Sequence, residues 1–286
     1  MNVDDWIKAG KIAAEVLEYG KKLIKVNESI LEVTEKIEFK IKSLRGQPAF
    51  PVNLSLNYIA AHYTAYKDDK TRFKEDDLVK LDLGVHVNGA IGDNAVTIDL
   101  GNNNLLVEAS KKALDEAVKI AKEDIEVREI GYVIQDKIQE FGFAPIINLS
   151  GHRLDEYKVH AGLTIPNYDN NDKTKLEKDM VIAIEPFATN GEGKVIEGKG
   201  SDIFKLLKKK PVRNEYARKI LSEIEKYNGF PFAKRWINSS MKDLAFNILE
   251  REKIIHQYPQ LIEASRGLVS QAEHTVMIGK GVLTKI

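Results

Sequence analysis

Two stretches of sequence decide the fold: VKLDLGVHV at residues 79–87 and AIGDNAVTIDL at residues 90–100. Both are rich in aliphatic and β-branched residues. They are separated by Asn88-Gly89, which is the strongest short signal for a two-residue hairpin turn. The pattern therefore predicts an antiparallel β-hairpin from Leu78 to Leu100.

This hairpin places two acidic side chains together. Counting back from the turn pairs Gly84 with Asp93 and Asp82 with Ala95. Because side chains two apart on a strand share a face, Asp82 and Asp93 should be diagonal neighbours on one side, about 7 to 8 Å apart at the backbone. Strands disfavour Asp, and two carboxylates this close need a cation or a shared proton. The pair is a candidate functional site, although two solvent-facing strand residues remain an alternative.

Helical periodicity and shorter β-type runs surround the hairpin. The predicted helices cover residues 5–26, with Asp4 or Asp5 as N-cap, 29–44, with the capping-box spacing of Ser29 and Glu32, 105–121 and 130–141. Residues 46–51 are expected to form a loop. The predicted short strands are INLSG at 147–151, MVIAIEP at 180–186 and GLVSQAEHTVMI at 267–278. The sheet should thus recruit segments from the middle and the far end of the chain.

The composition narrows the chemistry that the chain can carry. Its 286 residues include 43 Lys and Arg against 43 Asp and Glu, so no global charge favours nucleic acid or an anionic membrane. There is no cysteine, which leaves His, Asp and Glu as metal ligands. The amino terminus is acidic where a signal peptide would be basic, and no apolar run reaches the roughly 18 residues of a membrane span. We expect a cytoplasmic protein without a membrane partner.

Residues 201–258 differ from both flanks. They are rich in Lys and Arg, show helical periodicity and contain none of the β pattern on either side. We interpret them as an inserted subdomain, with residues 1–200 and 259–286 forming the main domain. Such a unit could bind nucleic acid, but LLKKKPVR at residues 206–213 is more typical of a solvated face. No specific nucleic-acid partner is therefore expected.

Three further polar residues stand at the ends or centres of apolar runs. Glu185 ends MVIAIE, and Glu273 interrupts VSQAEHTVMI. His152 follows INLSG, where Gly151 allows a tight turn. With the two hairpin aspartates they make four carboxylates and one imidazole, which balance two divalent cations and a bridging hydroxide. The set predicts a dinuclear hydrolase site, although each residue alone could be a paired structural group.

Longer motifs carry a family resemblance. They are AFPVNLSLNYIAAHYTA (49–65), LDLGVHVNGAIGDNAVTID (81–99), NLSGHRLDEYKVHAGLTIPN (148–167), IAIEPFATNGEGKVIEG (182–198) and QAEHTVMI (271–278). Over nearly its whole length the chain resembles the type 2 methionine aminopeptidases, and the five candidate ligands agree with that family's pattern in order and in flanking motif. It lacks the long charged amino-terminal extension of the eukaryotic members and so resembles a short archaeal form.

The resemblance implies an α+β pita-bread fold. In that fold, two pseudo-symmetric halves enclose a central metal cleft, and a helical, winged-helix-like subdomain is inserted. The resemblance implies that Asp82 chelates one metal and that Asp93 and Glu273 bridge both. His152 and Glu185 complete the other metal, and Glu185 is also the candidate proton shuttle.

The resemblance also assigns residues to the substrate. His62 and His160 match two cleft histidines that contact the substrate and help to stabilise the tetrahedral intermediate. Phe50, Phe187 and Tyr258 match positions that line the family's methionine pocket, and each could equally be ordinary core. The implied reaction removes the initiator methionine from nascent polypeptides with a small second residue. A hydroxide bridging two ions of Co, Mn, Fe(II) or Zn attacks the first peptide carbonyl.

The remaining histidines receive no catalytic role. His86 shares the predicted face of Asp82, so spacing alone would make it a rival ligand, but the family pattern does not use it. His274 is expected to point away from the face of Glu273 by strand alternation. His256 lies in the insertion.

Two rival interpretations use the same fold. Proline dipeptidases and aminopeptidase P have the same ligand set, but they usually carry a separate amino-terminal domain and lack this insertion. Pita-bread proteins that have lost the metal site act as nucleic-acid or protein-interaction modules, and missing ligands are their mark. The sequence favours a monomeric enzyme and leaves open a docking role of the basic insertion near the ribosome.

Overall fold

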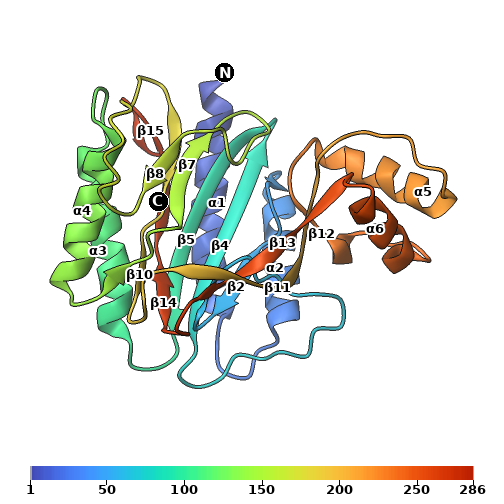
Figure 1. Cartoon of the computed structure of the whole chain (residues 1–286), viewed down its shortest axis with the longest axis horizontal. Helices are drawn as coiled ribbons and strands as arrows, with labels where there is room; N and C mark the ends of the chain where they lie inside the picture. The colour runs from blue at the N-terminus through green and yellow to red at the C-terminus, as the bar shows by residue number, and fades with distance from the viewer. Residues whose placement is uncertain (1, 286) are drawn as a thin grey trace.

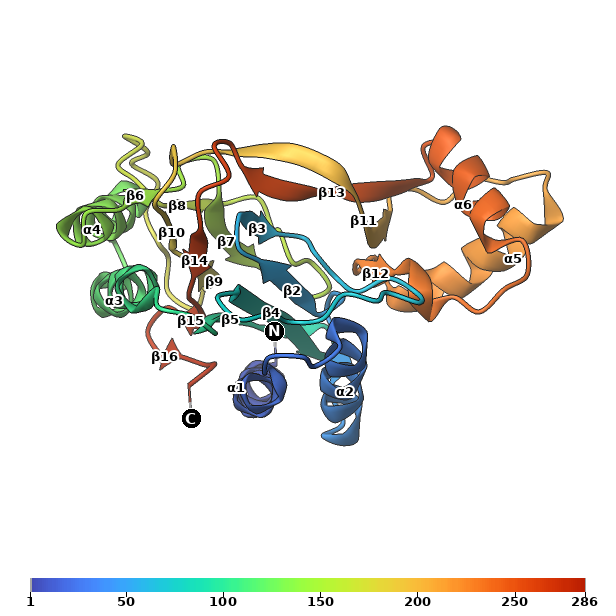
Figure 2. The same cartoon turned by 90° about the horizontal axis from the view of Figure 1, so that it is seen from below.

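The computed structural model describes residues 2–285 of the chain. Figure 1 shows a curved sheet flanked by helices, with a separate group of helices at one end of the molecule. The flanking helices are α1 (Val3–Leu23), α2 (Ile30–Ser43), α3 (Asn104–Ile120) and α4 (Val127–Glu140). In Figure 2 a long ribbon made of β11 (Val195–Leu206) and β13 (Ile255–Glu263) crosses the sheet on the side opposite α1 and α2. The sheet is therefore covered by helices on one side and spanned by the ribbon on the other.

The central sheet is antiparallel and joins distant parts of the chain. Its strands follow the order β1 (Gln47–Pro48), β4 (Leu78–Val87), β5 (Ala90–Asp99), β15 (Glu273–Met277), β9 (Val181–Ile184), β7 (Ser150–Leu154) and β8 (Thr164–Pro166), with β2 (Asn53–Leu56) paired to β4 and β16 (Gly281–Val282) paired to β15. Strand β15, near the C-terminus, lies between β5 and β9 and so connects the two halves. The expected recruitment of middle and far segments is confirmed.

Two smaller sheets complete the β structure. One consists of β14 (Val269–Gln271), β10 (Phe187–Thr189) and β6 (Ala144–Pro145). The other has the order β12 (Phe232–Ala233), β11, β13 and β3 (Ile59–Ala61). Because β3 comes from the first half of the chain, this second small sheet ties the ribbon to the main body.

The predicted hairpin forms with the predicted register. Gly84 pairs with Asp93 and Asp82 with Ala95, as counted from the turn. Asn88 has φ 51° and Gly89 has φ 94°, and positive values at both central residues define a type I′ turn. A two-residue turn of this kind fixes the register, so the shared face of the aspartates follows from local sequence.

The first two helices begin near their predicted residues. The N-cap of α1 is Asn2, whose side chain accepts from the backbone N–H of Asp4, so the assignment of Asp4 or Asp5 as N-cap was wrong. Both aspartates lie in the first turn instead, where the helix dipole favours negative charge. The α2 helix follows Ser29, whose side chain accepts from the backbone of Glu32 as predicted.

Further along the chain, several boundaries differ from the sequence-based prediction. The α4 helix begins at Val127 instead of residue 130 because Glu126 and Glu129 form a capping box. Residues 47–48 of the expected loop form β1. The run at 267–278 breaks at Ala272 into β14 and β15, which belong to different sheets. No helix within residues 2–285 is long and apolar enough to cross a membrane.

The tight turn predicted at Gly151 is absent because β7 continues through Gly151 and His152. Glycine is required there for another reason. A Cβ at Gly151 would lie 2.2 Å from the backbone oxygen of Ala183 on β9. His152 is therefore held by a strand ladder, which orients its side chain more firmly than a turn would.

The stretch 201–258 is mixed α/β. It contains α5 (Glu215–Ile224), α6 (Lys242–Arg251), the short helices η1 (Glu225–Tyr227) and η2 (Lys234–Trp236), β12 and parts of β11 and β13. The expectation that it lacks β structure was wrong, since the ribbon strands cross both predicted boundaries. These elements enclose an apolar cluster that includes Phe204, Ile220, Phe232, Phe246 and Leu249. The stretch thus has a core of its own, while the ribbon joins it to the main body.

Candidate metal centre

A cavity of about 330 Å³ lies between the central sheet and the ribbon. Its walls include the ten residues that the sequence assigned to metal or substrate, namely Phe50, His62, Asp82, Asp93, His152, His160, Glu185, Phe187, Tyr258 and Glu273. They come from strands of all three sheets and from the segments beside them. The fold therefore brings residues more than 200 positions apart to one cleft.

Strand register aligns three of the carboxylates across neighbouring strands. Asp82 on β4 lies opposite Ala95 on β5, and Ala95 lies opposite Glu273 on β15. Residues directly opposite one another in an antiparallel sheet share a face. Asp93, two residues before Ala95, projects from that same face. The sheet face that Asp82 and Asp93 share thus also carries Glu273, on a third strand.

The other half of the sheet brings a histidine and a fourth carboxylate. His152 on β7 pairs with Ala183 on β9, and Glu185 follows just beyond the end of β9. His152 Nε2 lies 3.5 Å from Glu185 Oε1 and 3.9 Å from Asp93 Oδ2. Ligand atoms of Asp93, His152 and Glu273 all lie within 4.8 Å of one another. The two halves of the molecule therefore meet at one cluster.

Without a cation, the carboxylates of the cluster are unfavourable in their ionised forms. Burial raises the pKa of Asp82 to about 7. Burial also raises the pKa of Asp93, Glu185 and Glu273 well above the ordinary values, and repulsion between the carboxylates adds to the effect. The pKa of His152 is lowered to about 3, chiefly by burial, so its imidazole is neutral. Within residues 2–285, no Lys or Arg forms an ion pair with these carboxylates.

This donor set fits divalent cations. Asp82 Oδ1 and Asp93 Oδ1 are buried and have no hydrogen-bond partner among the described residues. Buried polar atoms of this kind need a partner, and a bound cation supplies one while offsetting the repulsion. Carboxylate oxygens with one neutral imidazole suit first-row transition metals. The four carboxylates and His152 therefore meet the chemical requirements of a metal centre.

Two further histidines face the cleft. The ring of His160 lies 4.3 Å from that of His152, centroid to centroid. Burial, and after it the positive charge of Lys205, lowers the pKa of His160. His62 Nδ1 lies 3.1 Å from the carbonyl oxygen of Pro259, and burial lowers the pKa of His62 to about 4. Both imidazoles can therefore meet a substrate in their neutral form.

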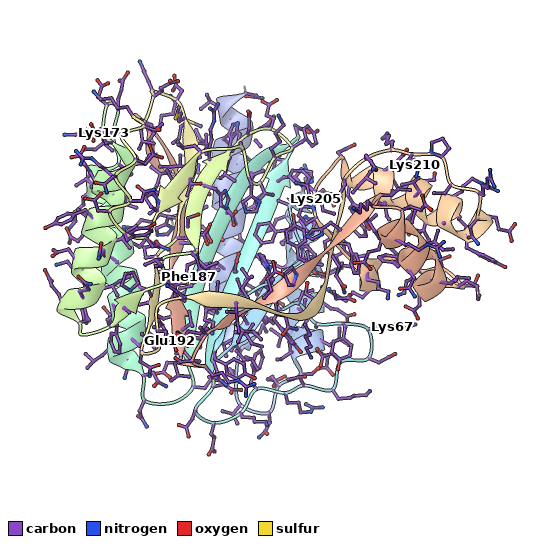
Figure 3. All side chains as sticks on the ribbon, in the orientation of Figure 1. Lys67, Lys173, Phe187, Glu192, Lys205 and Lys210 are labelled. Carbon is purple, nitrogen blue, oxygen red and sulfur yellow. The ribbon has the colours of Figure 1, made fainter. Side chains whose placement is uncertain are left out.

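Aromatic side chains form an apolar wall. Phe187 starts β10 beside the central sheet, and Figure 3 labels it there. Phe50 lies over Gly84, where a Cβ would come within 2.3 Å of the phenyl ring. The ring of Tyr258 meets that of His62 edge-on at 5.4 Å. An apolar wall next to a polar cluster can hold an uncharged side chain while the polar groups reach the backbone.

The other histidines on the sheet lie outside the cleft. His86 shares the strand face of Asp82 but stacks on Phe230, with 4.5 Å between ring centroids. His274 Nδ1 lies 3.0 Å from Thr284 Oγ1, away from the cluster, as strand alternation predicts. Neither side chain lines the cavity.

Some residues of the site were missed by sequence reasoning. Gln271 Nε2 donates to Glu185 Oε2 at 3.4 Å, and Ile203 and Pro231 of the insertion line the cavity. Gln271 stands two positions before Glu273 in the run that the sequence predicted as one strand, so alternation along that predicted strand could have suggested it, although the two residues lie on separate strands. No such local signal exists for Ile203 or Pro231, because their position depends on how the ribbon crosses the sheet.

Solved structures share this architecture. A methionine aminopeptidase from Thermotoga maritima superposes with a TM-score of 0.73 at 23% identity, covering 99% of this chain and 96% of that one. A thermophilic Arx1 gives a TM-score of 0.85 at 16% identity, covering 97% and 89%. At these identities the likeness shows the fold alone. The predicted pita-bread fold is confirmed.

Sequence comparison is more specific. Residues 5–217 match metallopeptidase family M24. The methionine aminopeptidase of Pyrococcus abyssi is 47% identical over 287 residues, covering 98% of this chain and 97% of that protein. That match agrees with the resemblance to short type 2 enzymes drawn from the motifs. The chain belongs to metallopeptidase family M24, among its archaeal methionine aminopeptidases.

Proposed function

We propose that the protein removes the amino-terminal methionine from nascent polypeptides whose second residue is small, and that it does so in the cytoplasm. One observation supports the proposal above all others. Four carboxylates and one histidine line one cleft, with Asp93, His152 and Glu273 buried, in a chain that is 47% identical to the methionine aminopeptidase of Pyrococcus abyssi. A site so costly to bury is retained for chemistry.

We propose that the cleft holds two divalent metal ions, drawn from Co, Mn, Fe(II) and Zn. Asp82 would bind one, Asp93 and Glu273 both, and His152 and Glu185 the other. When bound, two such ions acidify a water molecule and polarise the substrate carbonyl. The ligand types do not select one metal over the others, so availability in the cell decides.

The protein's own groups would move the proton and orient the peptide. Glu185 lies in the cluster with Oε1 3.5 Å from His152 Nε2, and we assign it to take a proton and return it to the leaving amine. His160, whose ring lies 4.3 Å from that of His152, would stabilise the oxygen of the scissile carbonyl as negative charge develops on it. His62 donates from Nδ1 to Pro259, so its Nε2 is free to accept from a substrate N–H.

The apolar wall would select the first side chain. Phe50, Phe187 and Tyr258 surround the same cavity as the metal cluster. An unbranched thioether is polarisable and favours contact with aromatic rings. We therefore assign the methionine side chain to this wall.

The inserted stretch would shape the cleft. Ile203, Pro231 and Tyr258 reach the cavity from within residues 201–258. We propose that this stretch acts as a subdomain closing one side of the site. Its winged-helix likeness, a monomeric state and docking near the ribosome stay predictions.

A peptide assay tests the proposed function. Purified protein supplied with Co²⁺ or Mn²⁺ should release methionine from Met-Ala-Ser. The variant His152→Ala should lose most of this activity. Cleavage of Xaa-Pro peptides in place of Met-Ala-Ser would favour a proline peptidase. If neither substrate is cleaved and no divalent metal binds, the chain would instead be a binding protein with the same fold.

A further inference from the structure

One lysine of the insertion lies on the face of the ribbon that is turned toward the cleft. Phe204 on β11 is buried in the apolar core of the insertion. Because side chains alternate along a strand, its neighbours Ile203 and Lys205 point to the opposite face. Ile203 lines the cavity. Lys205 therefore follows Ile203 on the cavity side of the ribbon.

The partner strand gives the same orientation independently. Lys205 pairs with His256 on β13, and residues directly opposite share a face. The ring of His256 lies 5.3 Å from that of Tyr258, which lines the cavity. Figure 3 labels Lys205 between the central sheet and the helices of the insertion. Both strands of the ribbon thus direct this face toward the cleft.

The charge of Lys205 is available to a ligand. In the described part of the chain, no carboxylate lies within ion-pair distance of its ammonium group, whereas the nearby Lys209 and Lys210 pair with Glu225 and Glu252. The cleft side of the ribbon therefore carries a positive charge without an ion-pair partner among the described residues.

We propose that Lys205 makes the enzyme sensitive to the charge of substrate residues beyond the small second one, with a preference for Asp or Glu at the third to fifth positions. This inference rests on the proposed function, which places the substrate's amino terminus at the metal cluster. The following residues must then leave through the mouth, advancing about 3.3 to 3.6 Å per extended residue. Lys205, on the cleft side of the ribbon, would meet them there.

Peptides that differ only in downstream charge test the inference. Met-Ala-Asp-Asp-Ser should be cleaved with a kcat/KM about two- to five-fold higher than Met-Ala-Lys-Lys-Ser at low salt, the range of a solvent-exposed ion pair. The difference should lie in KM, since a contact remote from the reacting bond binds ground state and transition state alike. Salt should reduce it by screening.

Lysine variants test whether the preference for acidic residues depends on Lys205. Lys205→Gln should abolish the preference, and Lys205→Glu should reverse it. Lys208→Gln removes an exposed charge that lies beyond the end of β11 and should leave the preference intact. Equal loss in Lys205→Gln and Lys208→Gln would assign the preference to the general basic field of the insertion and overturn the inference.

Failure of the inference is distinguishable from failure of the function. If wild-type protein cleaves Met-Ala-Ser but treats the charged peptides alike, only the role of Lys205 falls. If no peptide is cleaved, the proposed function falls. In that case equilibrium binding of the same two charged peptides, followed by fluorescence of a label at their C-termini, still decides whether Lys205 discriminates between them.

Discussion

His62 Nδ1 lies 3.1 Å from the carbonyl oxygen of Pro259, a contact that links the end of β3 to the ribbon. A carbonyl oxygen only accepts, so Nδ1 carries the proton and Nε2 is left as an acceptor. The backbone of His62 has φ 65°, a left-handed conformation that a non-glycine residue keeps only where its surroundings compensate. Backbone and side chain together therefore present Nε2 to the cleft.

Replacing this histidine should impair catalysis without emptying the metal site. We expect His62→Ala to lower kcat/KM on Met-Ala-Ser by about 100- to 1,000-fold, the cost of losing one positioned hydrogen-bonding group. Metal content, measured by atomic absorption, should match that of the wild type because His62 is not a ligand. A fall in metal content would show that the histidine supports the cluster instead.

The lowered pKa of His62 also predicts how stability depends on pH. Its pKa is about 4 in the folded protein, against about 6.5 in an unfolded chain. Between these values the unfolded chain binds a proton that the folded protein does not, so acidification favours unfolding. The free energy of unfolding should therefore fall less between about pH 7 and about pH 4.5 in His62→Gln than in the wild type. Urea titrations at both pH values measure this difference, and parallel falls would exclude it.

Within the hairpin, Gly84 lies against Phe50 of the aromatic wall. It pairs with Asp93, and a Cβ there would lie 2.3 Å from the ring of Phe50. Gly84→Ala should displace that ring and lower kcat/KM on Met-Ala-Ser, while metal content stays unchanged. The double variant Gly84→Ala/Phe50→Leu should recover part of the loss because the smaller side chain makes room. Without such recovery, the damage would have to come from the hairpin itself.

The hairpin part of the site, with Asp82 and Asp93, could be predicted from local sequence. The part contributed by Glu273 could not. Asn88-Gly89 fixes a two-residue turn, and every pairing back to Asp82 follows from it. Glu273 joins the same row only because β15 inserts between β5 and β9. This strand order depends on long-range packing, which no local sequence pattern encodes. The family resemblance supplied it.

The same distinction explains the errors. His152 was expected after a strand, yet β7 extends through it because Gly151 lets β9 approach closely. The insertion was expected to be helical because only short ends of the ribbon strands, residues 201–206 and 255–258, lie within it, and the exposed part of the ribbon with glycines and charges, Glu197 to Gly200, lies just before it. A ribbon open to solvent has no alternating apolar pattern to recognise.

A buried ion pair should anchor the insertion to the main body. Glu38 of α2 accepts from Arg235 Nη2 and, at 2.9 Å, from Trp236 Nε1. Arg235→Leu leaves an unpaired buried carboxylate and should lower the free energy of unfolding by about 3 to 5 kcal/mol. Adding Glu38→Gln should restore part of it, as a double-mutant cycle in urea would show. Asp243→Asn, which breaks the exposed pair with Lys234, should cost no more than about 1 kcal/mol.

Metal removal should destabilise the protein, because the carboxylates of the cleft then repel one another. A ligand that binds only the folded protein stabilises it by about 2.7 kcal/mol at 100 times its Kd, so dialysis against EDTA should lower Tm and added Mn²⁺ should restore it. Without metal, Asp82, Asp93 and Glu273 repel one another in a buried site.

The double variant Asp82→Asn/Glu273→Gln removes two of these charges at nearly constant size. Its metal-free form should therefore melt at a higher temperature than metal-free wild type, although Mn²⁺ should no longer raise its Tm. Calorimetric scans of both proteins with and without Mn²⁺ would measure the four melting temperatures. A metal-free double variant less stable than metal-free wild type would mean that the carboxylates support the fold through hydrogen bonds and are not held together against their repulsion.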